Sequence, residues 1–325
     1  MISRRNLILA FGASALAVPY LALAQRQKIY RIGYLANDPD RRSPTFQAFI
    51  ATLQERGWIE GKNIVIDYLT SDGRDERFPA LAADAVQKNV DIIVTTGSGS
   101  TAAAKAATDR IPIVFGSAAN PVEQKFVGSL ARPGGNITGL ALLVQELEPK
   151  RLQILKEILP RATRFARLYQ GNTTQPINTE EDDAAARALG VALQHIAVAG
   201  VDEIDNVFAA VAKNRPDAIM VKADSMFVVN RSRIAALAIK YRLPMMCADG
   251  RFAEAGALLS YGEDFASRYR RAALLVDKIL RGAKPADLPV EQSTIFELVI
   301  NVNTATALGI TIPQPVLLQA DRVVK

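Results

Sequence analysis

Six short polar segments hold the residues of this chain that could act on a ligand. They are rich in glycine, serine, threonine, asparagine and aspartate, and they comprise residues 35–38, 96–101, 117–121, 170–174, 223–225 and 248–250. Hydroxyl and amide groups donate hydrogen bonds to an anion, and a carboxylate accepts them from a cation. The segments are therefore suited to holding the polar head of a small solute, although turns and helix N-caps use the same residue types.

Patterns for catalysis and for metal binding are sparse. One histidine and one cysteine in 325 residues cannot build the usual histidine-rich metal site or an internal disulfide. His195 lies inside an expected strand, and the sequence contains no G-x-S-x-G nucleophile motif. Gly97-x-Gly99-x-x-Ala102 meets only a relaxed dinucleotide fingerprint, because it follows the third expected strand rather than the first. We therefore predict no enzyme, no cofactor and no metal.

The overall composition is that of an ordinary folded protein. The net charge is +6, with 49% hydrophobic and 22% charged residues. Lysine and arginine are scattered along the chain rather than gathered into a stripe, so we predict no binding of nucleic acid. The single cysteine, Cys247, is expected to be a small buried residue at the end of a strand.

The first 24 residues are typical of an export signal. Arg4 and Arg5 precede an apolar run over residues 7–23, and Ala22-Leu23-Ala24 forms a small-x-small cleavage site. Residues 3–8 also approximate a twin-arginine signal. A membrane anchor is the alternative, but the apolar run is shorter than the roughly 20 residues that span a bilayer and contains Pro19. We expect cleavage after Ala24 and a periplasmic location.

The elements that must position the polar segments alternate between short β-branched runs and helical patterns. The first series predicts strands at residues 30–35, 64–69, 91–95 and 111–115. A turn cluster over residues 131–136 interrupts the rhythm, and a second series then predicts strands at residues 164–169, 192–198, 218–221 and 244–247. Such alternation is typical of βαβ units. We predict an α/β fold with two similar Rossmann-like lobes, each with a parallel sheet, joined by a hinge.

The expected lobes are discontinuous in sequence. After a signal peptide at residues 1–24, lobe 1 would comprise residues 25–118 and 262–291, and lobe 2 residues 119–261 and 292–325. A long helix over about residues 263–281 should pack back on lobe 1. Because loops at the carboxyl ends of parallel strands gather beside helix N-termini, the six polar segments should face one another across a cleft that closes on a ligand.

Ordered segments along most of the chain match a known family. They include IPIVFG at residues 111–116, SLARPGGNITG at 129–139, RFAEAG at 251–256, SYG at 260–262, KPADLPVE at 284–291, FELVIN at 296–301 and ALGITIP at 307–313. With these segments the chain resembles the ABC-transporter substrate-binding proteins, some of which bind tryptophan or other aromatic amino acids. The resemblance implies the type I periplasmic-binding fold, a solute held between the lobes, and delivery to a membrane permease. We also expect a monomer.

The resemblance also implies which loops hold the solute. The loops after the third and fourth strands would grip an α-carboxylate and share the ammonium group, and Asp224 would be the anionic partner of that ammonium. The candidate binding residues are Asn37, Ser98, Thr101, Ser117, Ala118, Asn120, Asn172, Asp224 and Asp249. Many relatives carry an acidic residue where this chain has Asn120, and a neutral amide cannot balance an ammonium charge. Candidate walls of the pocket are Tyr34, Phe115 and Phe227.

These patterns together predict a binding protein that performs no bond chemistry. We expect the extracytoplasmic solute-binding protein of an ABC importer, with an amino acid or a carboxylate bearing an apolar or aromatic tail as its solute. A periplasmic sensor subunit for a receptor kinase is the alternative, and an exported enzyme is a weaker one.

Overall fold

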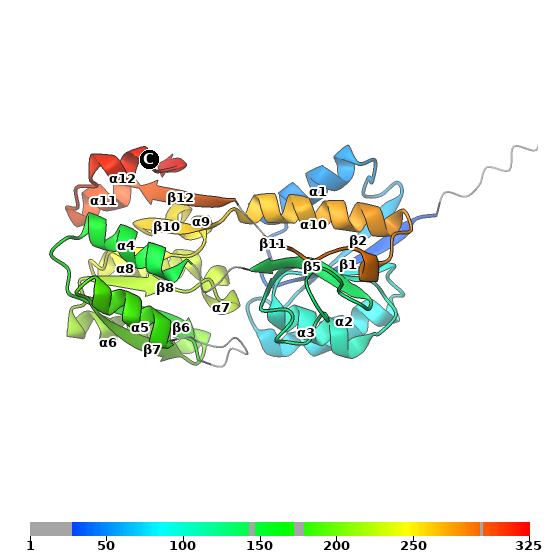
Figure 1. Cartoon of the computed structure of the whole chain (residues 1–325), viewed down its shortest axis with the longest axis horizontal. Helices are drawn as coiled ribbons and strands as arrows, with labels where there is room; N and C mark the ends of the chain where they lie inside the picture. Colours follow the sequence, from blue (N-terminus) through cyan, green and yellow to red (C-terminus); the bar gives the residue numbers. More distant parts are fainter. Residues whose placement is uncertain (1–27, 143–146, 172–178, 293–294) are drawn as a thin grey trace, which may run out of the picture.

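The computed structural model describes residues 28–142, 147–171, 179–292 and 295–325, which form two α/β lobes lying side by side along the long axis (Figure 1). Each lobe contains one mostly parallel sheet with helices on both faces, so the predicted fold class is confirmed. Strands covered on both faces consist of nearly continuous apolar residues, as in the fully buried strands β3 and β8. Within the described ranges, no helix is both long enough and apolar enough to cross a membrane.

The sheet of the first lobe has the order β11-β5-β4-β3-β1-β2, and all of its neighbouring strands are parallel. Its strands are β1 (Tyr30–Ala36), β2 (Ile64–Thr70), β3 (Ile92–Thr95), β4 (Ile113–Ala119), β5 (Ile137–Leu142) and β11 (Glu291–Gln292). Helices α1 and α10 cover one face and α2 and α3 the other (Figure 1). These helices are α1 (Pro44–Glu55), α2 (Phe78–Gln87), α3 (Ser98–Ala107) and α10 (Phe265–Leu280), with short 3₁₀ turns η1 (Asp75–Arg77) and η3 (Pro285–Asp287).

The sheet of the second lobe has the order β13-β12-β10-β9-β8-β6-β7, and within it only β10 and β12 run antiparallel. Its strands are β6 (Arg164–Gln170), β7 (Ala192–Val198), β8 (Ala218–Val221), β9 (Met245–Cys247), β10 (Leu259–Glu263), β12 (Phe296–Asn301) and β13 (Arg322–Val324). Its helices are α4 (Glu148–Ile158), α5 (Thr179–Ala188), α6 (Ile204–Asn214), α7 (Ser225–Val229), α8 (Arg231–Lys240), α9 (Gly250–Glu254), α11 (Val302–Leu308) and α12 (Gln314–Leu318), with the 3₁₀ turn η2 (Val201–Glu203).

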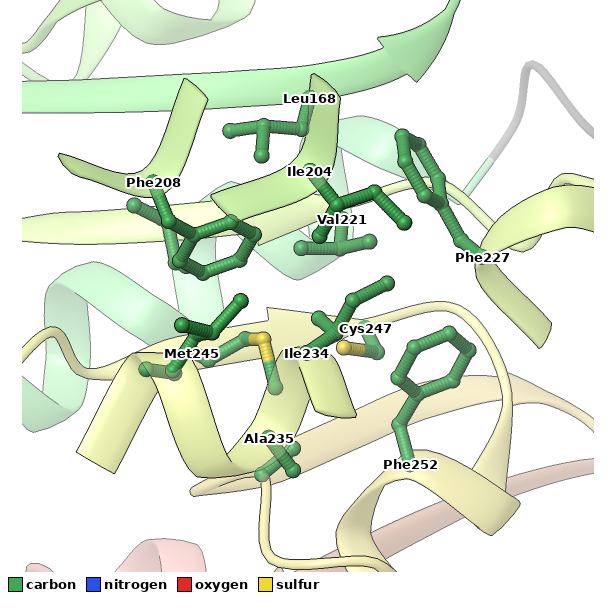
Figure 2. Close-up of a cluster of buried hydrophobic side chains, with 14 of the residues drawn as sticks. Leu168, Ile204, Phe208, Val221, Phe227, Ile234, Ala235, Met245, Cys247 and Phe252 are labelled. Atoms are coloured by element: carbon green, nitrogen blue, oxygen red, sulfur yellow. The ribbon is translucent and has the colours of Figure 1, made fainter. Parts of the chain in front are cut away.

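One apolar cluster fills the space between the second sheet and helices α6 to α9. Figure 2 shows Phe208 of α6, Ile234 of α8 and Phe252 of α9 converging on strand side chains, among them Cys247 of β9. Cys247 is 1% exposed, which agrees with the expectation of a small buried residue. Burial raises the pKa of this thiol well above its usual range, because the thiolate would lose its hydration.

Helix α10 belongs to the first lobe although it follows β10 of the second. Asp264 caps it by accepting a hydrogen bond from the Ser267 N–H at 3.0 Å. Its buried stripe includes Tyr269, Ala273 and Val276, which pack into the same cluster as α1 and β1. The prediction of a long helix that packs back on the first lobe is therefore confirmed.

The first sheet extends further along the chain than the expected boundary after residue 118. Strand β5 pairs in parallel with β4, Ile113 opposite Ile137, so residues 137–142 belong to the first sheet and α4 is the first helix of the second lobe. The connection from β4 to β5 contains turns and no helix, so the alternation that predicted the other strands is missing there. The close pairing needs glycine at Gly139, whose φ is +154° and where a Cβ would lie 2.1 Å from the Phe115 carbonyl oxygen.

Candidate ligand-binding site

A cavity of about 140 Å³ lies between the two lobes. The loops that line it follow the carboxyl ends of β1, β3, β6, β8 and β9, as expected for parallel sheets. Its size is similar to that of a small apolar cavity of about 150 Å³ that holds one benzene ring. The cavity is therefore suited to one small solute.

The start of α3 presents hydrogen-bond donors to this cavity. The backbone N–H groups of Ser98 and Gly99 have no acceptor among the described residues, as expected for the first turn of a helix. The Ser98 hydroxyl oxygen accepts from the Ala119 N–H at 3.1 Å and from Gln124 Nε2 at 3.3 Å, which leaves its own proton to donate. Ser117 adds a second hydroxyl from the end of β4. These donors, with the positive end of the helix dipole, favour an anion.

Asp75 places a carboxylate beside the same helix start. A Cβ on Gly99 would lie 3.3 Å from Asp75 Oδ2, so glycine permits this close approach. The other oxygen, Oδ1, is buried and has no hydrogen-bond partner within the described ranges. Burial raises the pKa of Asp75, a nearby Ser225 hydroxyl lowers it in part, and the charge of Asp224 raises it further. Asp75 lines the cavity and forms no ion pair among the described residues, so its carboxylate is available to a cationic group of a ligand.

The second lobe contributes a lysine and an aspartate that follow β8. Lys222 Nζ lies 3.9 Å from Asp224 Oδ1, and Asp224 Oδ2 accepts from the Gln170 N–H at 2.8 Å. Both side chains are almost fully buried and line the cavity. Burial raises the pKa of Asp224, while Lys222 and the Gln170 N–H offset part of the shift. Asp224 therefore already has a cationic neighbour.

A second buried network lies at the start of α4. Glu148 Oε1 accepts a hydrogen bond from Arg151 Nη1 at 2.7 Å and lies 3.5 Å from Arg167 Nη2. Arg167 also pairs with Asp182 of α5, and Arg151 Nε donates to the Tyr261 carbonyl at 2.7 Å. Two cations and two carboxylates thus balance one another, and the network holds α4, α5 and β10 together beneath the cavity.

Charged side chains also join the two lobes across the cavity. Asp38, which follows β1, lies 3.1 Å from Arg231 Nη1 and 3.8 Å from Arg251 Nη1, both of the second lobe. Arg251 holds Asp249 with contacts of 3.0 Å and 2.6 Å. Burial alone would raise the pKa of Asp249, but Arg251 lowers it below its usual range. The two ion pairs of Asp38 form only when the lobes are close together, whereas the Arg251–Asp249 pair lies within the second lobe.

The comparisons with known proteins agree with this two-lobe geometry. The model of the ABC transporter substrate binding protein family matches residues 38–324. The chain belongs to this family. A tyrosine-binding protein of Clostridioides difficile (strain R20291) is 25% identical over 288 residues, 88% of this chain and 82% of that protein.

Two solved structures resemble this substrate-binding protein over 91% of its length and all of theirs. A conserved domain protein from Vibrio cholerae is 28% identical with a TM-score of 0.84. An ABC domain from Streptococcus pneumonia, solved in complex with L-Trp, is 24% identical with a TM-score of 0.83. The fold is that of the type I periplasmic-binding proteins, as the resemblance implied.

The structure brings five of the nine candidate residues of this substrate-binding protein to the cavity wall. They are Asn37, Ser98, Ser117, Asp224 and Asp249. The Asn37 amide oxygen accepts from the Thr96 hydroxyl, and this contact orients its side chain. Asp249 is engaged by Arg251 and caps α9, so it supports the wall rather than offering a free carboxylate. Asn172 lies outside the described residues.

Three candidates do not line the cavity. Thr101 is fully buried behind it, where its hydroxyl lies 2.7 Å from Thr95 Oγ1 and donates to the Gly97 carbonyl. Ala118 faces the core of the first lobe. Asn120 adopts a left-handed turn with φ of +43° and accepts the Gln124 N–H through its backbone oxygen. Loop position predicted these residues, but the first turns of α3 direct Thr101 into the core, strand alternation directs Ala118 there, and Asn120 lies in a left-handed turn.

Aromatic side chains form one wall of the cavity. Tyr34 stacks on Tyr68 with ring centroids 5.4 Å apart and lies 6.4 Å from Tyr269. Phe265 lines the cavity too, beneath the Arg251 guanidinium at 5.7 Å. Three wall residues were predicted from the sequence. Tyr34 lines the cavity, whereas Phe115 and Phe227 belong to the cores of the two lobes. A flat apolar group of a ligand would pack well against this wall.

Two charged residues of the cavity, Asp75 and Lys222, were not among the candidates predicted from the sequence. Asp75 follows β2, and the rule that placed the other polar segments at carboxyl ends of strands would have included the run from Ser71 to Asp75. Lys222 directly follows β8, one residue before the segment selected for its turn residues. From the sequence alone, a lysine at that position is expected to be exposed to solvent, and only the packing of the second lobe buries it.

Proposed function

We propose that this substrate-binding protein captures a free α-amino acid outside the cytoplasm for an ABC importer. The proposal rests on one observation: groups that favour an anion and a group that favours a cation lie next to each other in the cavity. N–H groups at the start of α3 that have no acceptor among the described residues favour an anion, and the Asp75 carboxylate beside them, which lines the cavity without an ion pair in the same ranges, favours a cation. An α-amino acid carries both charges, on two groups attached to the same carbon atom.

The charges of the cavity support a ligand with an ammonium group. Among the cavity-lining carboxylates that the structure describes, Asp75 alone has no ion pair, because the others face the cations Arg231, Arg151, Lys222, Arg251 and Arg268. An uncompensated carboxylate in a closing cleft is costly, and an ammonium group of the ligand offsets that cost. We therefore assign the ammonium to Asp75 rather than to Asp224.

The α-carboxylate would lie at the start of α3. Ser98 and Gly99 would donate backbone N–H groups, and the Ser98 and Ser117 hydroxyls would add two further bonds. Closure of the lobes expels water, which strengthens each of these hydrogen bonds. The closed lobes then present one joint surface to the permease, and the protein needs no partner copy to complete its cavity.

An aromatic side chain fits the remaining wall. The relatives named above include a tyrosine-binding protein and a domain bound to L-Trp, and this chain lines its cavity with Tyr34, Tyr68, Phe265 and Tyr269. Stacked or edge-on aromatic pairs contribute about 0.5–1.5 kcal/mol beyond the area that they bury. We propose aromatic amino acids as the ligand class, and export through the signal-like N-terminus as the route to the periplasm.

Titration calorimetry tests this proposal with three ligands that share one ring. Phenylalanine should bind, whereas 3-phenylpropionate, which lacks the ammonium, and phenethylamine, which lacks the carboxylate, should each bind at least roughly tenfold more weakly. Asp75→Asn should weaken the binding of phenylalanine by roughly tenfold or more and leave the binding of 3-phenylpropionate unchanged. Asp72→Asn, at a half-exposed carboxylate paired with Arg77, is the matched control and should bind as the unmodified protein does.

Two results would refute the proposal. One is equal binding of phenylalanine by the protein and by Asp75→Asn. The other is a screen of all common amino acids that finds no ligand while a sugar or a nucleoside produces heat.

A further inference from the structure

Lys222 is a buried cation that lacks a hydrogen-bond acceptor within the described part of the chain. Its side chain is 6% exposed and lines the cavity. The nearest charge is Asp224 Oδ1 at 3.9 Å, which is too far for a hydrogen bond. An ammonium group has three donors, and leaving them unpaired in a closed cavity is unfavourable. A ligand atom that accepts a hydrogen bond would satisfy this group.

Asp224 supplies the complementary acceptor. Its Oδ2 is engaged by the Gln170 N–H, so Oδ1, the oxygen that faces Lys222, is the atom available to a ligand. A donor and an acceptor about 4 Å apart match a hydroxyl group, which accepts one hydrogen bond and donates another. An apolar group would satisfy neither side chain.

The surrounding charges favour a neutral hydroxyl over a carboxylate. Arg151 and Arg167 are already paired with Glu148 and Asp182, so they do not leave an excess of positive charge beside Asp224. A second carboxylate on the ligand would lie against Asp224 and be repelled by it. A hydroxyl adds no charge to a pair that is already balanced.

We propose that Lys222 and Asp224 together form a specificity site that recognises a phenolic hydroxyl at the end of the ligand's side chain. The proposal rests on the proposed function, in which Asp75 and the start of α3 hold the amino-acid head. The aromatic wall of Tyr34 and Tyr269 holds the ring, and the Lys222–Asp224 pair distinguishes a ring that carries a hydroxyl from one that does not.

Calorimetry with tyrosine and phenylalanine tests the specificity site, because these ligands differ by one oxygen. A site built to hydrogen-bond a hydroxyl discriminates strongly against the analogue that lacks it. We expect the protein to prefer tyrosine by roughly tenfold or more. Lys222→Met should lose most of this preference through weaker tyrosine binding while its phenylalanine binding stays the same or improves. Lys222→Gln, which retains a neutral donor, should keep part of the preference.

Control measurements separate this inference from the proposed function. Lys213→Met, at an exposed lysine near the end of α6, should keep the full preference, and melting curves should show that each variant is folded. Equal binding of both ligands by the unmodified protein, or an unchanged preference in Lys222→Met, overturns the specificity site and leaves the amino-acid proposal standing. Tighter binding of glutamate than of tyrosine also overturns it. Failure of every amino acid to bind overturns the proposed function itself.

Discussion

The Asp38 carboxylate lies 3.1 Å from the Arg231 guanidinium, although the two residues are 193 positions apart and belong to different lobes. Arg251 of the second lobe approaches the same carboxylate to 3.8 Å. Asp38 thus links the lobes on the side of the cavity where β1 ends. Because the link consists of protein groups alone, it stabilises the closed arrangement whether or not a ligand is bound.

Removing this link should shift the ligand-free protein toward an open form. Asp38→Asn weakens two ion pairs, and since Arg231 remains partly exposed we expect a loss of about 1 kcal/mol, or roughly fivefold in the opening equilibrium. Small-angle X-ray scattering should record a larger radius of gyration. Asp40→Asn, in the same loop but paired within the described ranges only with the exposed Arg42, is the control and should leave the scattering unchanged. Identical curves for Asp38→Asn and the unmodified protein would exclude a role for the link.

Ligand binding should weaken on acidification at a higher pH than an ordinary aspartate predicts. Burial raises the pKa of Asp75 above its usual value of 3.8, so the carboxylate that faces the ammonium becomes neutral sooner as the pH falls. Calorimetry over pH 7 to 4 should show this decline for the unmodified protein. In Asp75→Asn the weaker residual binding should be flat over the same range, and a parallel decline in both proteins would contradict the assignment.

The Asp75 carboxylate should also lower the stability of the folded, ligand-free protein at pH 7. A raised pKa in the folded state means that the ionised form is disfavoured by folding, so the cost is present at pH 7 and disappears as the pH falls through the folded-state pKa. Asp75→Asn should therefore melt higher than the unmodified protein at pH 7, by on the order of 1–2 °C, and lose this advantage in acid.

Arg268 should be essential for the connection between the lobes. It is fully buried, pairs with Glu263 and donates to the carbonyl oxygens of Gly116 and Leu140, the latter at 2.7 Å. Arg268→Met removes the cation partner of Glu263 and leaves carbonyl groups without their donor, so we expect a loss of about 3–5 kcal/mol in the free energy of unfolding. Urea titration followed by circular dichroism measures this loss.

A neighbouring arginine provides the control for this variant. Arg270 is exposed on the same helix, and Arg270→Met should change stability by less than about 0.5 kcal/mol. Similar unfolding midpoints for the two variants would show that the Arg268 contacts contribute little.

Local hydrophobic patterns in the sequence were sufficient to predict most of the helices and strands of the fold. The alternation of apolar strands with helical stripes predicted the order of β1 to β4 and of β6 to β9, and the stripe through Tyr269 and Val276 predicted α10. Strand β5 was not predicted, because the connection from β4 to β5 carries no helical pattern. Its pairing with β4 depends on contacts that local periodicity does not encode.

For the candidate site too, some features could be predicted from the sequence and others depend on tertiary contacts. Most of the loops that reach the cavity could be predicted from the sequence, because parallel strands bring their carboxyl ends to one edge and these loops carry glycine, serine and aspartate; the loop after β2, with Asp75, was the exception. Only the tertiary structure decided which side chains there remain free. Asp249 is paired with Arg251, Asp224 faces Lys222, and Asp75 forms no ion pair with any residue that the structure describes. Such pairings are set by the three-dimensional approach of distant segments, and no spacing along the chain specifies them.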